Sequence, residues 1–483
     1  MTPHGPDPEA YAQRRRAVRA DLAAGAAGAS SGTAGTGASS PGTNAGTSGG
    51  AATGNGASNA GTCSGAVLFL PESPELIFSN DVHFAYRPET NLRYLTGFEE
   101  PAALLLTAHG SEEDGFTLCV KPRDEQSETW TGRRVGLDGA KEIYGADHAY
   151  ALEQTYEVLL RHLRHAAKLY YGHSRDPAVN QKVLELVHQA NAERPRRGGD
   201  PLVVAEAGPM LAEHRLRKRP EEIALMRTAG QLSAMAHRRL METLRPGDRE
   251  YQAQALLDYE FRYHGCAGPA YGTICAGGAN ATVLHYTRND DVLRDHDLLL
   301  VDAGGEYGGY CADITRTFPV GAAFSKPQAG LYDCVLAAQL AAIDLVRPGV
   351  TIEEVHKACV RVLTQGLLDL GTLDGSLDEC IEKAKYSPFY MHNTSHWLGM
   401  DVHDAGTYRR DGASQRLEPG MVLTVEPGLY LRADAPVAIE FRGIGIRIED
   451  DVLVTEAGAE VLTQAAPKQR AELETLRRAA LAR

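Results

Sequence analysis

The sequence predicts a soluble α/β (α+β) protein that folds as two domains. Its 483 residues suffice for two or three domains with sizeable cores. Apolar strand-like runs alternate with helical stretches between residues 66 and 211, and long amphipathic stretches mix with strands after residue 220. A basic run ending in a proline, residues 213–220, separates these regions and marks the expected domain boundary.

Composition excludes several classes of function. The net charge of −14 argues against a nucleic-acid-binding protein, because such proteins neutralise phosphates with Lys and Arg. The eight cysteines are scattered without a CxxC pair, which favours free thiols in a reducing compartment. Neither a signal peptide nor a run of eighteen apolar residues occurs, so we expect a cytoplasmic protein without a membrane span.

The N-terminal segment comprises residues 1–24, and a helix is predicted in it over residues 9–24. Residues 25–65 are almost entirely Gly, Ala, Ser, Thr and Asn, and they predict a flexible insertion spanning on the order of 35 Å. Residues 46–50 match the G-x-S-x-G pattern of a nucleophile elbow. No strand precedes them and no helix follows, so we attribute this match to composition.

The first domain is expected over residues 66–212. Strands are predicted at residues 66–70, 102–108, 116–120 and 168–172, and a helix is predicted near residues 152–167. The loops at residues 85–88 and 130–134 are rich in Arg and aromatic side chains. A surface ion pair or a half-buried aromatic ring is the ordinary interpretation of such loops.

The second domain is expected over residues 213–470, followed by a helical tail at residues 471–483. Helices are predicted at residues 220–244, 249–264, 326–346 and 352–370. A Pro-Gly pair follows the first of these helices at residues 246–247, and another follows the third at residues 348–349. This echo suggests a duplicated half-domain.

Residues 298–317 form the central motif of the second domain. Asp302 and Asp313 stand eleven residues apart, each next to an apolar strand-like run, with a glycine-rich turn between them. A hairpin at this turn would direct both carboxylates into one pocket from adjacent strands.

Other polar residues suited to metal or substrate binding lie in short motifs around this stretch: His285, His392, His396, His403, Glu426, Arg447 and Glu449. Glu426 ends a strand before a Pro-Gly turn. Alternation along a strand places Arg447 and Glu449 on the same face. Each residue alone has an ordinary interpretation as a cap, a loop residue or half of a surface ion pair.

Together these residues predict a metal site. Four carboxylates on apolar strands need a shared cation, because an unpaired buried charge is costly. Two Asp, two Glu and one His are too many ligands for one small ion, but bridging carboxylates between two divalent ions about 3.5 Å apart accommodate them. Oxygen ligands with a single imidazole favour Mn²⁺, with Fe²⁺, Co²⁺ and Zn²⁺ as alternatives. Two ions sharing one water imply hydrolysis.

The order and approximate spacing of five residues resemble the metal ligands of the pita-bread metallopeptidases: Asp302, Asp313, His396, Glu426 and Glu449. Residues 394–404 resemble the Xaa-Pro aminopeptidases (aminopeptidase P) of the bacterial type, and residues 94–101 and 130–134 resemble their N-terminal domain. The resemblance covers about residues 66–465. It implies a creatinase/aminopeptidase-P-like α/β domain followed by a pita-bread catalytic domain.

The same resemblance implies a division of labour among the ligands. Asp302 would hold one ion, Asp313 and Glu449 would bridge both ions, and His396 and Glu426 would complete the other. Glu426 would also act as the general base.

Substrate contacts follow from the resemblance too. His403 and His285 would hydrogen-bond the substrate carbonyl and stabilise its oxyanion. His392 would line the pocket for proline, while Arg447 would orient a ligand carboxylate. Arg87 and Trp130 of the N-terminal domain would reach an active site, either in the same subunit or in a neighbouring one.

The expected reaction is metal-hydroxide attack on the bond between an N-terminal residue and a following proline. Substrates would be peptides with proline in the second position, and the resemblance implies a homodimer or homotetramer. A prolidase, which cleaves only Xaa-Pro dipeptides, is the nearest alternative. A non-enzymatic pita-bread interaction protein is more remote, because all five ligand positions are filled.

Overall fold

The computed structural model describes residues 7–27, 64–109, 114–197 and 200–483. They form two compact units, Asp7–Met210 and Leu211–Arg483. The G-x-S-x-G match and most of the 25–65 insertion lie outside the described residues. Helix α1, Pro8–Ala27, begins one residue before the predicted range and extends three residues past it, into the expected coil. The alanine-rich end of the helix accounts for this extension, because alanine favours helix.

The first unit contains a six-stranded mixed sheet in the order β6-β5-β4-β1-β7-β8. Its strands are β1 (Ala66–Leu70), β4 (Ala102–Ala108), β5 (Phe116–Val120), β6 (His148–Ala151), β7 (Lys168–Tyr171) and β8 (Val203–Glu206). The predicted strands are confirmed at β1, β4, β5 and β7. Strands β6 and β8 were not predicted, because they form the two sheet edges and carry few buried apolar residues.

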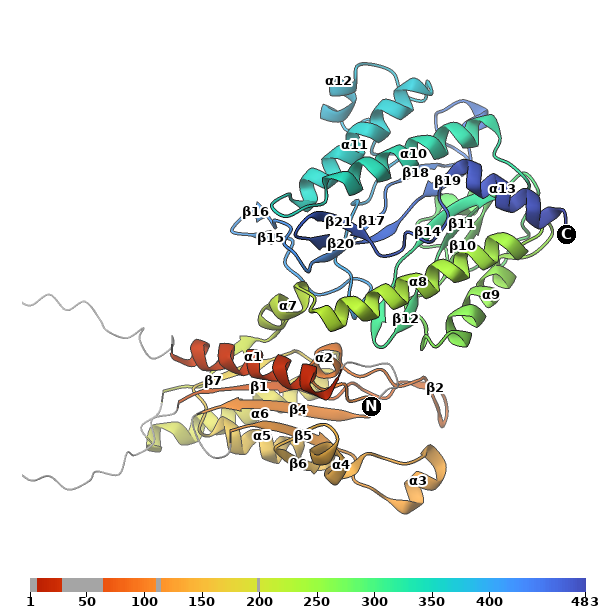
Figure 1. Cartoon of the computed structure of the whole chain (residues 1–483). Helices are drawn as coiled ribbons and strands as arrows, with labels where there is room; N and C mark the ends of the chain where they lie inside the picture. Colours follow the sequence, from red (N-terminus) through yellow and green to blue (C-terminus); the bar gives the residue numbers. More distant parts are fainter. Residues whose placement is uncertain (1–6, 28–63, 110–113, 198–199) are drawn as a thin grey trace, which may run out of the picture. The chain divides into compact units, whose positions relative to one another are not determined.

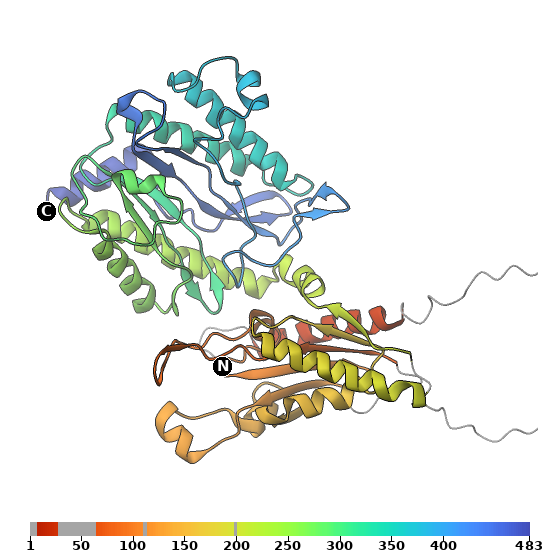
Figure 2. The ribbon, with the colours of Figure 1, turned by 180° about the vertical axis from the view of Figure 1, so that it is seen from behind.

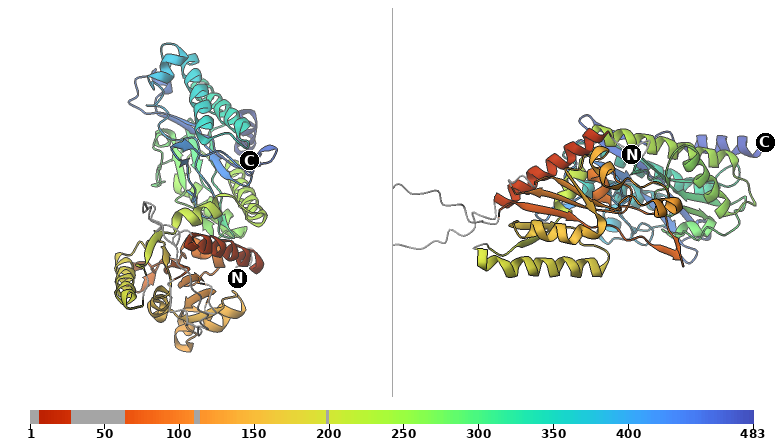
Figure 3. Two further views of the ribbon diagram at one scale, coloured as in Figure 1. Left: turned by 90° about the vertical axis from the view of Figure 1, so that its left-hand side faces the viewer. Right: turned by 90° about the horizontal axis from the view of Figure 1, so that it is seen from below.

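Helices cover both faces of this sheet. Helix α1 packs on one face against β1 and β4, and helices α5 (Thr155–Leu163) and α6 (Pro177–Glu193) pack on the other (Figures 1, 2 and 3). Phe69 and Leu105 point into the core beneath α5 and α6. The remaining elements are α2 (Thr90–Thr96), α3 (Glu125–Thr131), α4 (Gly136–Glu142), β2 (Ile77–Ser79), β3 (Val82–His83) and the 3-10 helices Leu152–Gln154 and Arg194–Arg197.

The second unit has strands between two groups of helices. Helices α8 (Pro220–Thr243) and α9 (Glu250–Tyr263) lie on one side, and α10 (Lys326–Leu345) and α11 (Ile352–Asp369) lie on the other (Figures 1 and 2). All four predicted helices are confirmed to within one residue. Ser325 and Thr351 as hydroxyl caps, and Pro220 in the first turn, explain the starts of α10, α11 and α8. The other helices are α7 (Gly208–Leu216), α12 (Leu377–Glu382), α13 (Arg470–Leu481) and the 3-10 helices Gly278–Thr282 and Ile439–Phe441.

The strands of this unit form several small antiparallel sheets. One contains β10 (Ile274–Gly277), β11 (Leu298–Asp302) and β14 (Thr315–Pro319), and another contains β17 (Val422–Val425), β20 (Asp450–Thr455) and β21 (Gly458–Val461). Strands β18 (Gly428–Leu431) and β19 (Ile444–Arg447) pair with each other, as do β15 (Arg409–Arg410) and β16 (Ala413–Ser414). Strand β12 (Gly305–Tyr307) lies between β9 (Gly268–Pro269) and β13 (Tyr310–Cys311).

The predicted hairpin between the two aspartates is confirmed, with one difference. Strands β11 and β14 pair antiparallel with Asp302 opposite Thr315, but Asp313 lies two residues before β14 and not on a strand. The connection folds into its own hairpin, β12–β13, whose turn residues Gly308 and Gly309 have φ of 57° and 88°. Asp313 therefore reaches the site from the segment that precedes β14.

The two Pro-Gly turns adopt the same backbone arrangement. The Gly247 N–H donates to the Leu293 carbonyl at 2.8 Å, and the Gly349 N–H donates to the Leu417 carbonyl at 2.8 Å. In both segments, a strand-end carboxylate follows nine residues after this leucine. The repetition supports the predicted duplication of a half-domain.

Candidate metal centre

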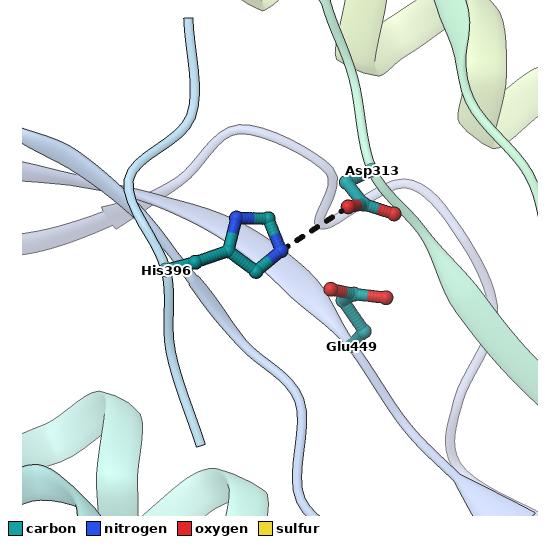
Figure 4. Close-up of side chains that lie close together, drawn as sticks. All are labelled: Asp313, His396 and Glu449. Atoms are coloured by element: carbon teal, nitrogen blue, oxygen red, sulfur yellow. Dashed lines mark ion pairs between the residues drawn. The ribbon is translucent and has the colours of Figure 1, made fainter. Parts of the chain in front are cut away.

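Three of the predicted ligands converge most closely. Asp313, His396 and Glu449 each offer a ligand atom, and these atoms all lie within 4.8 Å of one another (Figure 4). The His396 Nε2 atom is 3.5 Å from the Asp313 Oδ2 atom. The three side chains come from segments more than fifty residues apart and point into one space. Two carboxylates and one imidazole form a donor set suited to a divalent metal.

Asp302 and Glu426 border the same space. The Tyr271 hydroxyl lies 2.6 Å from Asp302 Oδ1 and 2.5 Å from Asp313 Oδ1, so it bridges the two carboxylates. Glu426 Oε1 lies 3.7 Å from His396 Nε2. All five predicted ligands therefore line one cavity of about 1000 Å³ in the second unit.

The electrostatics of the cavity favour a bound cation. Burial raises the pKa of Glu426 to about 8 and also raises the pKa values of Asp302 and Glu449, with neighbouring carboxylates adding to the effect. Burial alone would lower the pKa of His396, but its hydrogen bond to Asp313 and the nearby negative charges raise it to about 9. Positive charge placed among these carboxylates would relieve their mutual repulsion.

Arg447 is the buried cation of the site. Its guanidinium donates to Asp302 Oδ2 at 2.6 Å, to Thr315 Oγ1 at 3.0 Å and to the Tyr430 hydroxyl at 2.9 Å. The Thr315 hydroxyl in turn donates to Glu449 Oε2 at 2.7 Å. Arg447 ends β19 and Glu449 follows that strand, and both side chains line the cavity.

The three predicted substrate-binding histidines also line the cavity. His392 Nε2 lies 2.9 Å from the Tyr430 hydroxyl, and burial, helped by the charge of Arg447, lowers the pKa of His392 to about 4. The His403 ring meets the His396 ring edge-on, with centroids 4.5 Å apart, and burial lowers the pKa of His403. His285 stands on the wall formed by the segment after β10.

Family comparisons agree with this geometry. Residues 224–456 match the profile of metallopeptidase family M24, and residues 54–170 match the profile of the aminopeptidase P N-terminal domain. The chain is 43% identical to the Xaa-Pro aminopeptidase of Haemophilus influenzae, over 84% of this chain and 93% of that protein. It is 42% identical to the Escherichia coli Xaa-Pro aminopeptidase, over 85% of this chain and 93% of that protein.

The chain belongs to the aminopeptidase P family. Pseudomonas aeruginosa aminopeptidase PepP superposes with a TM-score of 0.87 at 39% identity, covering 99% of this chain and 100% of that one. Escherichia coli aminopeptidase P with the inhibitor Pro-Leu gives a TM-score of 0.87 at 37% identity, with 99% of this chain and 100% of that chain covered. The predicted family and pita-bread fold are therefore confirmed, and the chain is a hydrolytic metallo-exopeptidase.

Two predicted substrate contacts lie outside the unit that contains the cavity. Arg87 and Trp130 belong to the first unit, where both are exposed, Trp130 to 84%. Every residue that lines the cavity belongs to the second unit. A contact of either residue with an active site remains a prediction.

Sequence reasoning missed three hydroxyl groups that hold side chains of the site: Tyr271 and Thr315 contact ligand carboxylates, and Tyr430 contacts Arg447 and His392. Thr315 lies within the central motif, two residues after Asp313, so its position was a usable signal. The two tyrosines had no local signal, because the partners of their hydroxyl groups, Asp313 and Arg447, lie 42 and 17 residues further along the chain.

The backbone around Asp302 is anchored to helix α8. The His237 Nε2 atom lies 2.8 Å from the Ala303 carbonyl, and the Ser233 hydroxyl accepts the Gly305 N–H at 2.9 Å. A Cβ atom at Gly304 would lie 1.8 Å from the Ala312 carbonyl oxygen, so only glycine fits there. Among the described helices, none combines the length and apolar composition needed to cross a membrane.

Proposed function

We propose that this chain removes the N-terminal residue from peptides whose second residue is proline, using two divalent ions. The observation that carries the proposal is the convergence of the four predicted ligand carboxylates and His396 in one cavity that His285, His392 and His403 also line. The relatives named Xaa-Pro aminopeptidase support the choice of substrate.

The donor set fits two divalent ions. Asp302, Asp313, Glu426 and Glu449 carry four negative charges when ionised, and Arg447 is already engaged with Asp302. Two divalent cations would balance the four carboxylates. Asp302 would hold one ion, Asp313 and Glu449 would bridge, and His396 with Glu426 would hold the other. When bound, the ions would acidify a water molecule and polarise the scissile carbonyl.

The protein's own side chains would move protons and stabilise charge. Glu426 would accept a proton from the attacking water and transfer it to the leaving proline nitrogen. His403 and His285 would donate hydrogen bonds to the carbonyl oxygen as it becomes negative. The Arg447 guanidinium would keep the Asp302 carboxylate in place through their 2.6 Å hydrogen bond.

The pocket for proline would be formed around His392. Its ring contacts the Tyr390 ring edge-on at a centroid distance of 5.0 Å and lies beside the Tyr430 ring at 5.5 Å. Both tyrosine rings are buried and hold the His392 imidazole, which forms a wall of the cavity suited to a pyrrolidine ring. Because proline has no backbone N–H, no acceptor is needed for it on this wall.

The experiment that tests this function compares Gly-Pro-Ala with Gly-Pro as substrates in the presence of Mn²⁺. We expect cleavage of the tripeptide, and a decrease of more than about 100-fold in the Glu426→Gln variant. Glu418→Gln is the control, because Glu418 pairs with Arg217 at the surface. Cleavage of the dipeptide alone would favour the prolidase alternative, which the named relatives do not support.

The identity of the metal is part of the proposal. Carboxylate oxygens with one imidazole favour Mn²⁺, while Co²⁺, Fe²⁺ and Zn²⁺ remain alternatives. A solved Escherichia coli aminopeptidase P is zinc-substituted and in complex with product. Metal analysis of the purified protein, followed by reconstitution with each ion, would identify the ion that gives the highest activity.

We also propose a homodimer or homotetramer. The β2–β3 hairpin of the first unit exposes Ile77, Phe78, Val82 and Phe84 by 53% to 66% each. A patch of this kind commonly marks a protein–protein interface. In such an assembly, Arg87 and Trp130 would contact an active site. Light scattering should give the mass of two or four chains, and Phe78→Ser should reduce it. A monomeric wild type would contradict the proposal.

The cytoplasm is the proposed compartment. All seven cysteines in the described part of the chain are free thiols, and six of them are buried. Thiols of this kind suit a reducing environment. Fractionation of the source cells would test the assignment, and recovery outside the cytoplasmic fraction would contradict it.

A further inference from the structure

A cluster of four charged side chains lies behind His403. We call it the Asp404 cluster, and its members are Arg215, Lys218, Asp401 and Asp404. The Lys218 ammonium donates to Asp404 Oδ2 at 2.9 Å, and the Arg215 guanidinium donates to both Asp404 Oδ1 and Asp401 Oδ2. The side chains of Lys218 and Asp404 are 1% exposed, and that of Arg215 is 4% exposed.

The cluster pairs two cations with two anions, and three of its side chains are buried, whereas that of Asp401 is 37% exposed. Burial would raise the pKa of Asp404, but Lys218 and Arg215 lower it, so the carboxylate stays ionised. Buried ion pairs add little stability over an apolar replacement, because desolvation offsets their attraction. Loss of one partner is costly, however, because the remaining charge is left uncompensated. The cluster is therefore better suited to fixing a position than to stabilising the fold.

The Asp404 cluster fixes the position of the loop between His396 and His403. The Asp404 N–H donates to the Trp397 carbonyl at 2.9 Å, and His396 Nδ1 lies 3.0 Å from the same oxygen. The two ends of the loop therefore meet at the Trp397 carbonyl oxygen, and His403 is the residue directly before Asp404. The edge-on contact between the His396 and His403 rings is thus built on a backbone that the Asp404 carboxylate anchors.

Close packing gives the loop little freedom to shift. A Cβ atom at Gly399 would lie 2.2 Å from Asp404 Oδ2 and 3.0 Å from Lys218 Cε, so the glycine backbone sits directly on this ion pair. On its other side, the Gly399 carbonyl accepts the Cys311 N–H at 2.8 Å. The loop is therefore held between β13 and the Asp404 cluster.

We propose that the Asp404 cluster is a positioning device that sets the orientation of His403 toward the substrate carbonyl. The inference rests on the proposed function, in which His403 donates to that carbonyl. Lys218 and Asp404 do not line the cavity. They act through the loop backbone, and they are positioning residues that do not touch the substrate.

The test is a double-mutant cycle between Lys218 and His403. Lys218→Met removes the ammonium group and keeps the aliphatic stem, and Lys218→Arg restores a cation. We expect His403→Ala to lower kcat about 100-fold and Lys218→Met to lower it about 10-fold or more. The double variant should be no slower than His403→Ala alone, because Lys218 acts only through His403.

Separate measurements distinguish positioning from general damage. Lys218→Met should keep KM within about threefold, bind Mn²⁺ as the wild type does, and bind the dipeptide Pro-Leu with unchanged affinity by calorimetry. Lys218→Arg should recover most of the lost kcat. Arg217→Met is the matched control, because Arg217 is the adjacent cation but pairs with Glu213 and Glu418 at the surface. It should retain full activity.

Several results would overturn the inference. Multiplicative losses in the double variant would show that Lys218 acts independently of His403. Full activity of His403→Ala would show that His403 has no role in the reaction that the Asp404 cluster could support. A loss of Mn²⁺ binding in Lys218→Met would place the effect on His396. If Lys218→Met fails to fold, Asp404→Asn provides the same cycle. A wild type that does not cleave Xaa-Pro peptides would refute the proposed function as well, whereas an active wild type with multiplicative losses would refute the positioning role alone.

Discussion

Acidification should destabilise the second unit through His237, a fully buried histidine of helix α8. Burial lowers the pKa of His237 to about 4, against about 6.5 for an exposed histidine. Its Nε2 atom lies 2.8 Å from the Ala303 carbonyl, and its Nδ1 atom has no hydrogen-bond partner among the described residues. The folded protein therefore holds this imidazole neutral, with the proton on Nε2.

The sign and size of the effect follow from proton linkage. Between pH 6.5 and pH 4, the unfolded chain binds a proton at His237 and the folded chain does not, so the free energy of unfolding falls as the pH falls. The contribution of His237 is complete above pH 6.5 and is lost by pH 4. A difference of about 2.5 between the two pKa values corresponds to about 3 kcal/mol.

Tryptophan fluorescence isolates the second unit. The chain has two tryptophans, Trp130 in the first unit and the buried Trp397 in the second. In a Trp130→Phe background, urea unfolding followed at Trp397 would report the second unit, with a chelator present to remove metal linkage. His237→Gln keeps an N–H donor near the Ala303 carbonyl but does not titrate. Relative to this variant, the parent should lose about 3 kcal/mol between pH 7 and pH 4.

Parallel pH profiles for the parent and His237→Gln would refute the reasoning, because they would show that His237 binds its proton equally in both states. The control is His296→Gln in the same unit. The His296 side chain is 81% exposed, so His296→Gln should show the same dependence of the free energy of unfolding on pH as the parent.

Three further predictions concern the backbone at Gly304, the buried carboxylate of Glu250 and the removal of metal. Gly304→Ala should lower the free energy of unfolding by about 3 kcal/mol or more and abolish metal binding, because the added Cβ would clash with the Ala312 carbonyl. Gly272→Ala is the control for metal content, because the nearest atom to its added Cβ would be 3.5 Å away. Glu250→Gln should lower the free energy of unfolding in urea by about 2–4 kcal/mol, because the buried Glu250 carboxylate accepts four hydrogen bonds and an amide cannot accept them all. Equal stability of the variant and the parent would contradict this prediction. Dialysis against a chelator should abolish hydrolysis and lower the melting temperature at pH 7, and added Mn²⁺ should restore both; full activity after dialysis would argue against a metal centre.

Local sequence patterns predicted most of the regular structure. The long helices of the second unit were predicted from extended helical stretches, and α8 in addition from an amphipathic repeat that begins at Pro220, its first residue. The buried strands of the first unit were predicted because their residues are uniformly apolar. Edge strands β6 and β8 were missed, since an edge strand is half-exposed and resembles a loop in composition.

The candidate ligands were also predictable, because each sits in a motif that is unusual for its surroundings. An acidic residue at the end of an apolar strand, as at Asp302 or Glu426, is costly without a partner, and that cost is visible in the sequence. Lys218 shows the opposite case. It lies in the basic run at residues 213–220, which indicated only a boundary, and nothing local predicts its burial against Asp404.

The sequence by itself determined the family, the helices and central strands, and the five residues suited to bind metal. These depend on neighbours along the chain, where periodicity, capping and unusual buried charges are directly readable. Only the tertiary structure decided which groups meet: Tyr271 between two carboxylates, Thr315 between Arg447 and Glu449, and the Asp404 cluster behind His403. Those contacts join segments that are usually more than a hundred residues apart, so they arise only when the folded chain brings them together.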